Sequence, residues 1–237
     1  LSILIETMRR EGFELAVSRP EVIMKEIDGA LCEPYETVAI DIEDQHQGAV
    51  MERMGMRKGD LKDMVSDGKG RIRLDYMIPT RGLIGFRTEF MTATSGTGLI
   101  FSSFDHYGPA KKGKVAARQN GVLIANSLGK TTAYALYMLK DSGRMLVKPQ
   151  TEIYEGMIVG IHTRDNDLII NAAREKQLTN VRASGTDEAI TLTPPILFSL
   201  EQALEFIEED ELVEVTPHFI RIRKKLLKEN ERKRNKK

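Results

Sequence analysis

Apolar and polar residues alternate with two different periods between residues 35 and 107. Val38, Ile40 and Ile42 lie two apart, as in a strand with one buried face, whereas Val50 and Met54 lie four apart, as on one face of a helix. The pattern predicts a strand at 35–42, a helix at 48–57, strands at 61–65 and 71–78, a helix at 83–91 and a strand at 98–107. This β-α-β-β-α-β order is that of the ferredoxin-like, or split βαβ, module.

The start of the chain predicts too few elements for a domain. Apolar residues share one face of a helix that Gly12 can end, and strands are expected at 13–17 and, after Pro20, at 21–27. One helix and two short strands cannot close a hydrophobic core on their own. We therefore expect residues 1–28 to be half of a domain whose other half precedes Leu1, in a fragment of a longer protein.

The chain beyond residue 110 predicts a different architecture. A boundary rich in glycine and lysine at 108–114 precedes short strand-like segments at regular intervals, which favour a small barrel or sandwich. The expected elements are strands at 121–125, 132–139, 144–147 and 157–162, a helix at 200–207 that Ser199 would cap, and strands at 212–215 and 219–222. The predicted fold is α+β, with half a domain at 1–28, a ferredoxin-like domain at 29–110 and a β-rich, barrel-like domain with short helices at 111–237.

The composition is that of a globular protein. Hydrophobic residues make up 41% and charged residues 30% of the 237 residues. No apolar run approaches the roughly 20 residues needed to cross a bilayer. The single cysteine, Cys32, cannot form an internal disulfide, which mildly favours a reducing, cytoplasmic setting. A buried apolar role for Cys32 is favoured over a nucleophilic one, because free cysteines are mostly core residues.

The net charge of zero conceals an uneven distribution. The segment from Arg221 to Lys237 holds ten Lys and Arg against two Glu, so the other 220 residues together carry a charge of −8. A basic terminal segment beside an acidic body is typical of a tail that binds a polyanion. We expect this tail to contribute much to RNA affinity and little to the fold, with a solvated helical face as the alternative.

No catalytic motif is present in the sequence. The segment 128–132, LGKTT, is similar to the end of a phosphate-binding P-loop, but Ile124 stands where that loop needs a glycine for its turn. The four histidines lie in separate segments without a second ligand at metal spacing, and there is no GxSxG elbow. We therefore expect no catalysis, no metal and no cofactor in this chain.

Basic residues beside glycines, and in one long polar stretch, are the candidates for RNA contacts. Two turns, at 58–62 and 67–71, pair lysine with glycine, which lets a backbone approach phosphate closely; ordinary solvated turns are the alternative. The polar stretch 165–187 exceeds the usual loop length of about 12 to 15 residues, so we expect a recognition loop at 171–188, with a disordered insertion as the alternative. The candidate RNA-binding residues are Lys58, Lys62, Lys69, Arg71, Lys111, Lys112, Lys114, Arg164, Asn171, Arg174, Lys176, Asn180, Arg182, Arg221, Arg223, Lys224 and Lys225.

Several strings resemble those of translational GTPases. In the ferredoxin-like part, Glu33-Pro34, Arg57-Lys58-Gly59 and Phe104-Asp105-His106-Tyr107 resemble the fifth domain of elongation factor G. Tyr154–Gly160, Leu178–Ala183 and Asp210–Pro217, followed by Arg221–Lys224, resemble the C-terminal domain peculiar to the BipA, or TypA, family of these GTPases. Residues 1–28 resemble the second half of a third domain of the elongation factor G type, so the resemblance covers the whole chain.

The resemblance implies a non-catalytic fragment that binds the ribosome and rRNA. The GTP-binding domain of the family, with its GTP and Mg, is absent from this sequence, so the chain itself would not be an enzyme. The implied whole protein is a cytoplasmic factor, with no membrane partner and expected as a monomer, acting at the ribosomal A-site region in stress and cold response and in large-subunit assembly. A tRNA in the A site is a further candidate partner. A small-ligand-sensing regulatory module is the alternative, because ferredoxin-like domains also serve as sensors.

Overall fold

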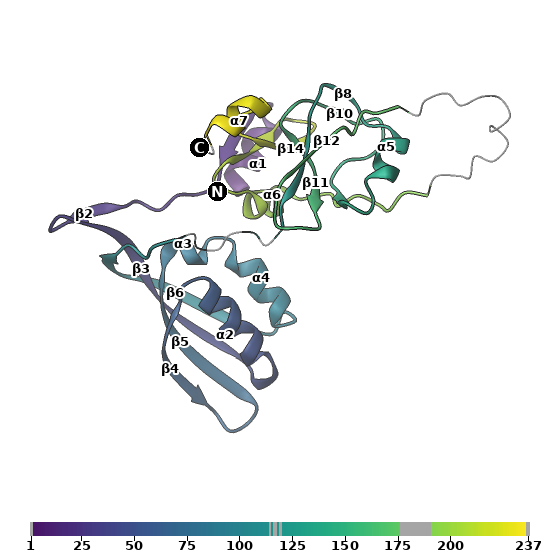
Figure 1. Cartoon of the computed structure of the whole chain (residues 1–237). Helices are drawn as coiled ribbons and strands as arrows, with labels where there is room; N and C mark the ends of the chain where they lie inside the picture. Colours follow the sequence, from purple (N-terminus) through teal and green to yellow (C-terminus); the bar gives the residue numbers. More distant parts are fainter. Residues whose placement is uncertain (1, 114, 116–117, 119, 176–190, 236–237) are drawn as a thin grey trace. The chain divides into compact units, whose positions relative to one another are not determined.

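The computed structural model describes residues 2–113, 115, 118, 120–175 and 191–235, and in it the chain forms two compact units (Figure 1). One, here called the central unit, is Pro20–Ala117. The other, here called the composite unit, combines Leu1–Arg19 with Arg118–Lys237. Within the described ranges, no helix is long and apolar enough to cross a membrane.

The central unit is built on an antiparallel sheet in the order β6-β3-β5-β4, with a short β2 paired to the start of β3. Its strands are β2 (Lys25–Ile27), β3 (Ala30–Glu43), β4 (Asp60–Ser66), β5 (Arg71–Pro79) and β6 (Leu99–Pro109). Its helices are η1 (Asp44–His46), α2 (Gln47–Met56), α3 (Thr80–Leu83) and α4 (Phe86–Ala93). The predicted ferredoxin-like order of strands and helices is confirmed.

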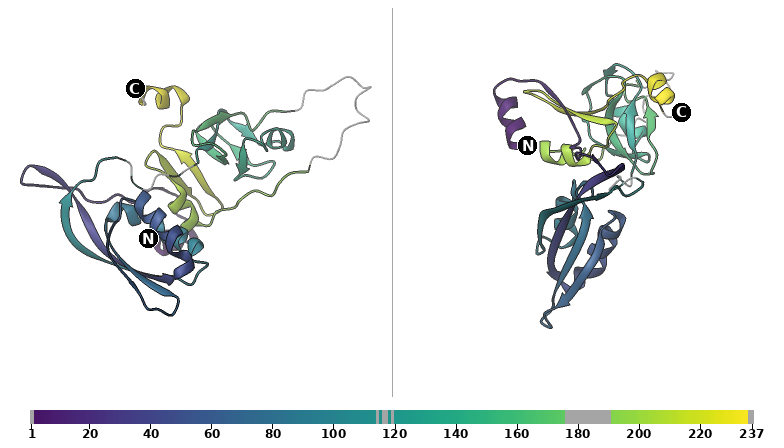
Figure 2. Two further views of the ribbon diagram at one scale, coloured as in Figure 1. Left: turned by 60° about the horizontal axis from the view of Figure 1, so that its bottom comes forward. Right: turned by 90° about the vertical axis from the view of Figure 1, so that its left-hand side faces the viewer.

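Alternation along β3 decides which face of this sheet is buried. Val38, Ile40 and Ile42 are buried and form one cluster with Met54 of α2 and Phe90 of α4. Figure 2 shows α2 and α4 on the same side of the sheet. The residues at a spacing of two on the strand and of three to four on the helices therefore pack together, as their spacing predicted.

The composite unit contains a seven-stranded mixed sheet whose main path is β1-β13-β14-β11-β7-β12, with β9 also paired to β11. Its strands are β1 (Leu15–Ser18), β7 (Val122–Ala125), β9 (Gly143–Met145), β11 (Met157–His162), β12 (Leu168–Ile170), β13 (Glu211–Val215) and β14 (Ile220–Lys224); β8 (Gly129–Lys130) and β10 (Glu152–Ile153) form a separate pair. Its helices are α1 (Ser2–Arg10), α5 (Ala133–Met138), α6 (Leu200–Phe206) and α7 (Glu229–Asn235). The α+β class is confirmed, but the described strands do not close into a barrel.

The N-terminal segment finds its partners at the other end of the chain. β1 pairs antiparallel with β13, with Leu15 opposite Val215. Ile5 of α1 is buried in the same cluster as Leu200 and Ala203 of α6. Packing therefore groups residues 1–19 with the C-terminal unit. That residues 1–28 are half of another domain concerns sequence before Leu1 and stays a prediction.

The strand predicted at 132–139 is wrong, because Ala133–Met138 is helix α5. An apolar run of this length fits a buried strand or a short helix equally well by its periodicity. The decision lies with Thr132, whose side-chain oxygen accepts a hydrogen bond from the amide of Ala135 at 3.1 Å and so caps the helix. The cap predicted at Ser199 is confirmed as a capping box with Gln202.

Candidate nucleic-acid interface

The basic residues predicted in the central unit divide into exposed and engaged side chains. Those exposed are Lys58, Lys62, Lys69 and Lys112. Arg71, by contrast, forms an ion pair with Asp41 at 2.5 Å, and Lys111 forms one with Asp60 at 2.6 Å. An exposed lysine without an ion pair can bind a phosphate at little cost in free energy, whereas Arg71 and Lys111 must first break their ion pairs. Lys114 lies outside the described residues.

Lys111 also belongs to an arrangement that fixes the end of the central unit. Glu33 is 0% exposed and accepts hydrogen bonds from Arg81 Nε at 2.5 Å and from the amide of Lys111 at 2.7 Å. Arg81 in turn donates to the carbonyl oxygens of Lys111 and Gly113. Burial of Cys32 beside this segment agrees with its predicted role as a small core residue.

The start of the predicted recognition loop, 171–188, is hydrogen-bonded to the N-terminal cap residue of α5, Thr132. The hydroxyl of Thr132 donates to the carbonyl oxygen of Arg174 at 2.6 Å, and the amide of Thr132 donates to the carbonyl oxygen of Ala172 at 3.2 Å. Ala172 is buried, while the side chains of Asn171 and Arg174 are exposed. Two predicted RNA-binding residues, Asn171 and Arg174, therefore lie in a segment that is hydrogen-bonded to Thr132. Lys176, Asn180 and Arg182 lie outside the described residues.

Three further residues, Leu128, Lys130 and Lys148, lie beside Ala172 and Arg174 without having been predicted. The amide of Asn126 donates to the carbonyl oxygen of Ile170 at 3.0 Å, which places the turn before β8 beside the same stretch. This turn carries Leu128, which is 84% exposed, and is followed by Lys130. The hydroxyl of Thr131 donates to the carbonyl oxygen of Lys148, which places Lys148 beside the end of β8. The LGKTT string at 128–132 contains Leu128 and Lys130, but its likeness to an incomplete P-loop does not indicate this position.

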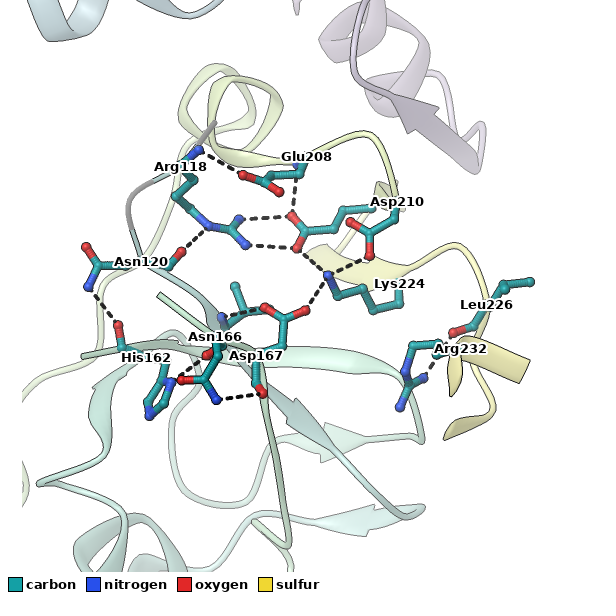
Figure 3. A network of polar contacts seen from close by, with 12 residues as sticks. Arg118, Asn120, His162, Asn166, Asp167, Glu208, Asp210, Lys224, Leu226 and Arg232 are labelled. Carbon is teal, nitrogen blue, oxygen red and sulfur yellow. Dashed lines mark hydrogen bonds and ion pairs between the residues drawn. The ribbon is translucent and has the colours of Figure 1, made fainter. Parts of the chain in front are cut away.

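Lys224 is the candidate that the structure removes from the surface (Figure 3). Its side chain is 4% exposed, and its Nζ lies 2.8 Å from Asp167, 2.9 Å from Asp210 and 3.0 Å from Glu211. Burial alone would lower the pKa of Lys224, but the attraction of Glu211 and the hydrogen bonds to Asp167 and Asp210 outweigh it and raise the pKa. The prediction of Lys224 as an RNA contact is therefore wrong, because its charge is used inside the fold.

Arg118 completes this network from the other side. Its guanidinium makes two parallel hydrogen bonds of 3.0 Å to the carboxylate of Glu211, and it lies 4.4 Å from the centre of the Phe206 ring. Paired bonds of this kind are the strongest geometry available to arginine. Asp167, which accepts from the amide of Val122 at 3.0 Å, closes the group. No local sequence pattern marked Arg118 or Asp167.

The basic tail is partly structural. Ile220–Lys224 is strand β14, which lies between β13 and β11. The first residues of the predicted tail therefore belong to the sheet, contrary to the expectation that the tail contributes little to the fold. Within it, Arg221 lies over the ring of Phe219 at 4.6 Å, and Arg223 pairs with Glu214 at 3.1 Å. Exposed charge remains at Lys225 and on the basic side of α7, and at Arg164 in the turn after β11.

Family models match both units. Residues 120–229 match the model described as the TypA/BipA C-terminal domain. Residues 30–118 match the model described as the elongation factor G C-terminus. The junction between the two matches falls where Arg118 enters the composite unit.

Several curated relatives align with almost all of this chain. Proteins named "Large ribosomal subunit assembly factor BipA" from Haemophilus influenzae and Salmonella typhimurium are 63% and 64% identical over 234 residues, which is 99% of this chain. The protein of the same name from Buchnera aphidicola is 57% identical over 234 residues. The chain spans only 38% of the Haemophilus protein and 39% of the other two.

Proposed function

The chain belongs to the TypA/BipA family of elongation factor G-like proteins, and we propose that it is the ribosome-binding part of a large-subunit assembly factor. One observation carries the proposal: relatives named for assembly of the large ribosomal subunit are 63% and 64% identical to nearly the whole chain. The chain matches the C-terminal part of the family, so binding rather than catalysis is the role that it supports.

The distribution of exposed charge supports binding to rRNA. The proposed contacts are the predicted residues that are exposed or partly exposed, together with four that lie outside the described residues. They are Lys58, Lys62, Lys69, Arg71, Lys111, Lys112, Arg164, Asn171, Arg174, Arg221, Arg223 and Lys225, with Lys114, Lys176, Asn180 and Arg182. Arginine and lysine neutralise phosphate, and asparagine offers a donor and an acceptor to bases exposed in folded RNA.

We further propose that the whole protein acts in the cytoplasm at the A-site region of the ribosome, where a tRNA would be a second partner, in stress and cold response. GTP and Mg would be bound by a domain outside this chain. Within the chain, the P-loop-like segment has other uses, because the Thr131 hydroxyl is bonded to the carbonyl oxygen of Lys148 and the Thr132 side chain caps α5. Saturable GTP binding to this chain in equilibrium dialysis would contradict that assignment.

The test compares ribosome binding with binding to random-sequence RNA. Alanine replaces Arg174, Lys176 and Arg182, and cosedimentation with purified large subunits is measured. We expect ribosome binding to weaken more than tenfold, about 1.4 kcal/mol, while binding to random RNA stays nearly intact through the remaining basic residues. Equal, small losses on both RNAs would mean that the stretch is only one more patch of positive charge.

A salt titration separates this function from a small-ligand sensor. Contacts with Z phosphates give a log–log slope of affinity against salt of about −0.9Z on a duplex and less on single strands. A sensor for a small neutral ligand would show almost no slope. A flat salt dependence of RNA binding would therefore favour the sensor.

A further inference from the structure

A cavity of about 240 Å³ lies in the composite unit beside α5. Leu136 and Tyr137 line it from the helix, Met145 from β9, and residues 191–195 from a segment without helix or strand. This segment is linked to β9, because the amide of Ile196 donates to the carbonyl oxygen of Met145 at 2.9 Å. The walls are thus a helix, a strand and a segment that is hydrogen-bonded to that strand.

Among the described residues, the lining combines an apolar interior with cations and no acid. Leu136 and Val147 are buried, and the proline rings of Pro194 and Pro195 add further apolar surface. Lys140 and Arg144, both exposed, are the charged residues among those that line the cavity. The ammonium of Lys140 lies 4.4 Å from the centre of the Tyr137 ring, so its charge is held beside the cavity. Such a lining suits a ligand with a flat apolar body and a negative charge.

We propose that this cavity binds one unpaired nucleotide of an RNA strand, with the base inside and the phosphate on Arg144 and Lys140. The volume is below the roughly 300–1,000 Å³ typical of sites for whole small-molecule ligands, which fits a single base better than a cofactor. Proteins commonly recognise splayed-out bases with aromatic side chains and arginine. The inference deepens the proposed function and rests on it.

The position of α5 supports this occupant. The hydroxyl of Thr132, at the start of α5, donates a hydrogen bond to the carbonyl oxygen of Arg174. Arg174 is the last basic residue described before residues 176–190, which lie outside the described part of the chain. Residues 191–195, which line the cavity against the far end of α5, follow residues 176–190. A strand bound by Arg174 would therefore meet the cavity at the other end of one short helix.

The test uses the whole chain and a short fluorescein-labelled single-stranded oligoadenylate, with binding followed by fluorescence anisotropy. Thr193→Trp fills the cavity and keeps both cations, and Thr193 is exposed, so the fold should tolerate it. Arg144→Ala removes one positive charge at the cavity. Arg10→Ala removes one from α1, where Arg10 forms only an exposed ion pair, and is the matched control.

We expect Thr193→Trp and Arg144→Ala each to weaken oligoadenylate binding at least fivefold, and Arg10→Ala to weaken it less than twofold. Only Arg144→Ala should reduce the salt slope, by about 0.7 on this single strand. Oligoadenylate binding by Thr193→Trp at the wild-type level, or equal losses for Arg144→Ala and Arg10→Ala, would overturn the proposal. AMP binding as tight as that of the oligonucleotide would assign the cavity to a free nucleotide instead. Because no ribosome is present, failure here is distinct from failure of the ribosome-binding test.

Discussion

The two units share one device and use it to different depths. Each has a glutamate that is 0% exposed, Glu33 in the central unit and Glu211 in the composite unit, and each glutamate receives an arginine next to the segment that connects the units. Glu33 meets one cation, Arg81, whose side chain is 27% exposed. Glu211 meets two, Arg118 at 14% and Lys224 at 4%. The two units therefore differ in how much buried positive charge the glutamate helps to compensate.

Breaking a buried pair by removing one partner costs more than the pair contributes, because the other charge is left behind without compensation. Arg81 can regain water after loss of its partner, whereas Lys224 is closed off from solvent. The comparison therefore predicts unequal costs for chemically identical substitutions in the two units.

The largest effect is expected for Glu211→Gln. Arg118 and Lys224 would both lose a buried negative partner, and we expect the free energy of unfolding of the composite unit to fall by about 3–5 kcal/mol. Urea denaturation followed by circular dichroism measures it. The exposed Glu209→Gln is the matched control, with little expected change. Equal stabilities of the two variants would show that the network does not hold the unit together.

A smaller loss is expected for Glu33→Gln in the central unit. The amide oxygen can still accept from Lys111, and Arg81 is partly hydrated, so we expect a loss of about 1.5–3 kcal/mol, the range for hydrogen bonds to charged groups. The same denaturation experiment, with tyrosine fluorescence as a second probe, measures it against the exposed Glu26→Gln. A loss as large as that of Glu211→Gln would refute the comparison between the units.

The two units also differ in how far sequence pattern could predict them. In the central unit β2 pairs with β3 and β4 with β5, which are neighbours along the chain, and Val38, Ile40 and Ile42 mark the buried face directly. In the composite unit β1 pairs with β13, nearly the whole chain away, and periodicity carries no information on such pairing. The short apolar run of α5 fits a strand and a helix equally well, so its period does not distinguish them.

Lys224 shows a signal that was present but outweighed. Ile220, Ile222 and Lys224 alternate with Arg221 and Arg223, so the strand pattern alone places Lys224 on the face of Ile222, which is buried. The density of basic residues from Arg221 onward pointed instead to a solvated tail. Its acidic partners could not be predicted, because Asp167 and Glu211 come from segments that only the tertiary fold brings together.

Acid should affect the composite unit through Asp167. Burial alone would raise the pKa of Asp167, but Lys224 and the amide of Val122 outweigh it and lower the pKa. A lowered pKa gives stability that is present above the unfolded-state value, about 3.9, and is lost as the pH falls through the folded-state value. Asp167→Asn should therefore cost about 1–2 kcal/mol at neutral pH and less as the pH falls below about 4. Urea denaturation across this range measures the loss, and a constant cost at every pH would contradict the assignment. Asp165→Asn, at an exposed neighbour, is the control.

The smallest effect is expected for Asp210→Asn, which tests whether burial or the number of carboxylates decides. Asp210 lies 2.9 Å from Lys224, as close as Asp167 and Glu211, but its side chain is 58% exposed. Water already screens an exposed carboxylate, so its attraction to Lys224 contributes about 0–1 kcal/mol. Lys224 keeps the buried Glu211 and the partly buried Asp167 in the variant, and we expect the unfolding midpoint in urea to change little. A loss comparable to that of Glu211→Gln would show that Lys224 needs all three negative charges, and the depth of burial would then not explain the difference between the two units.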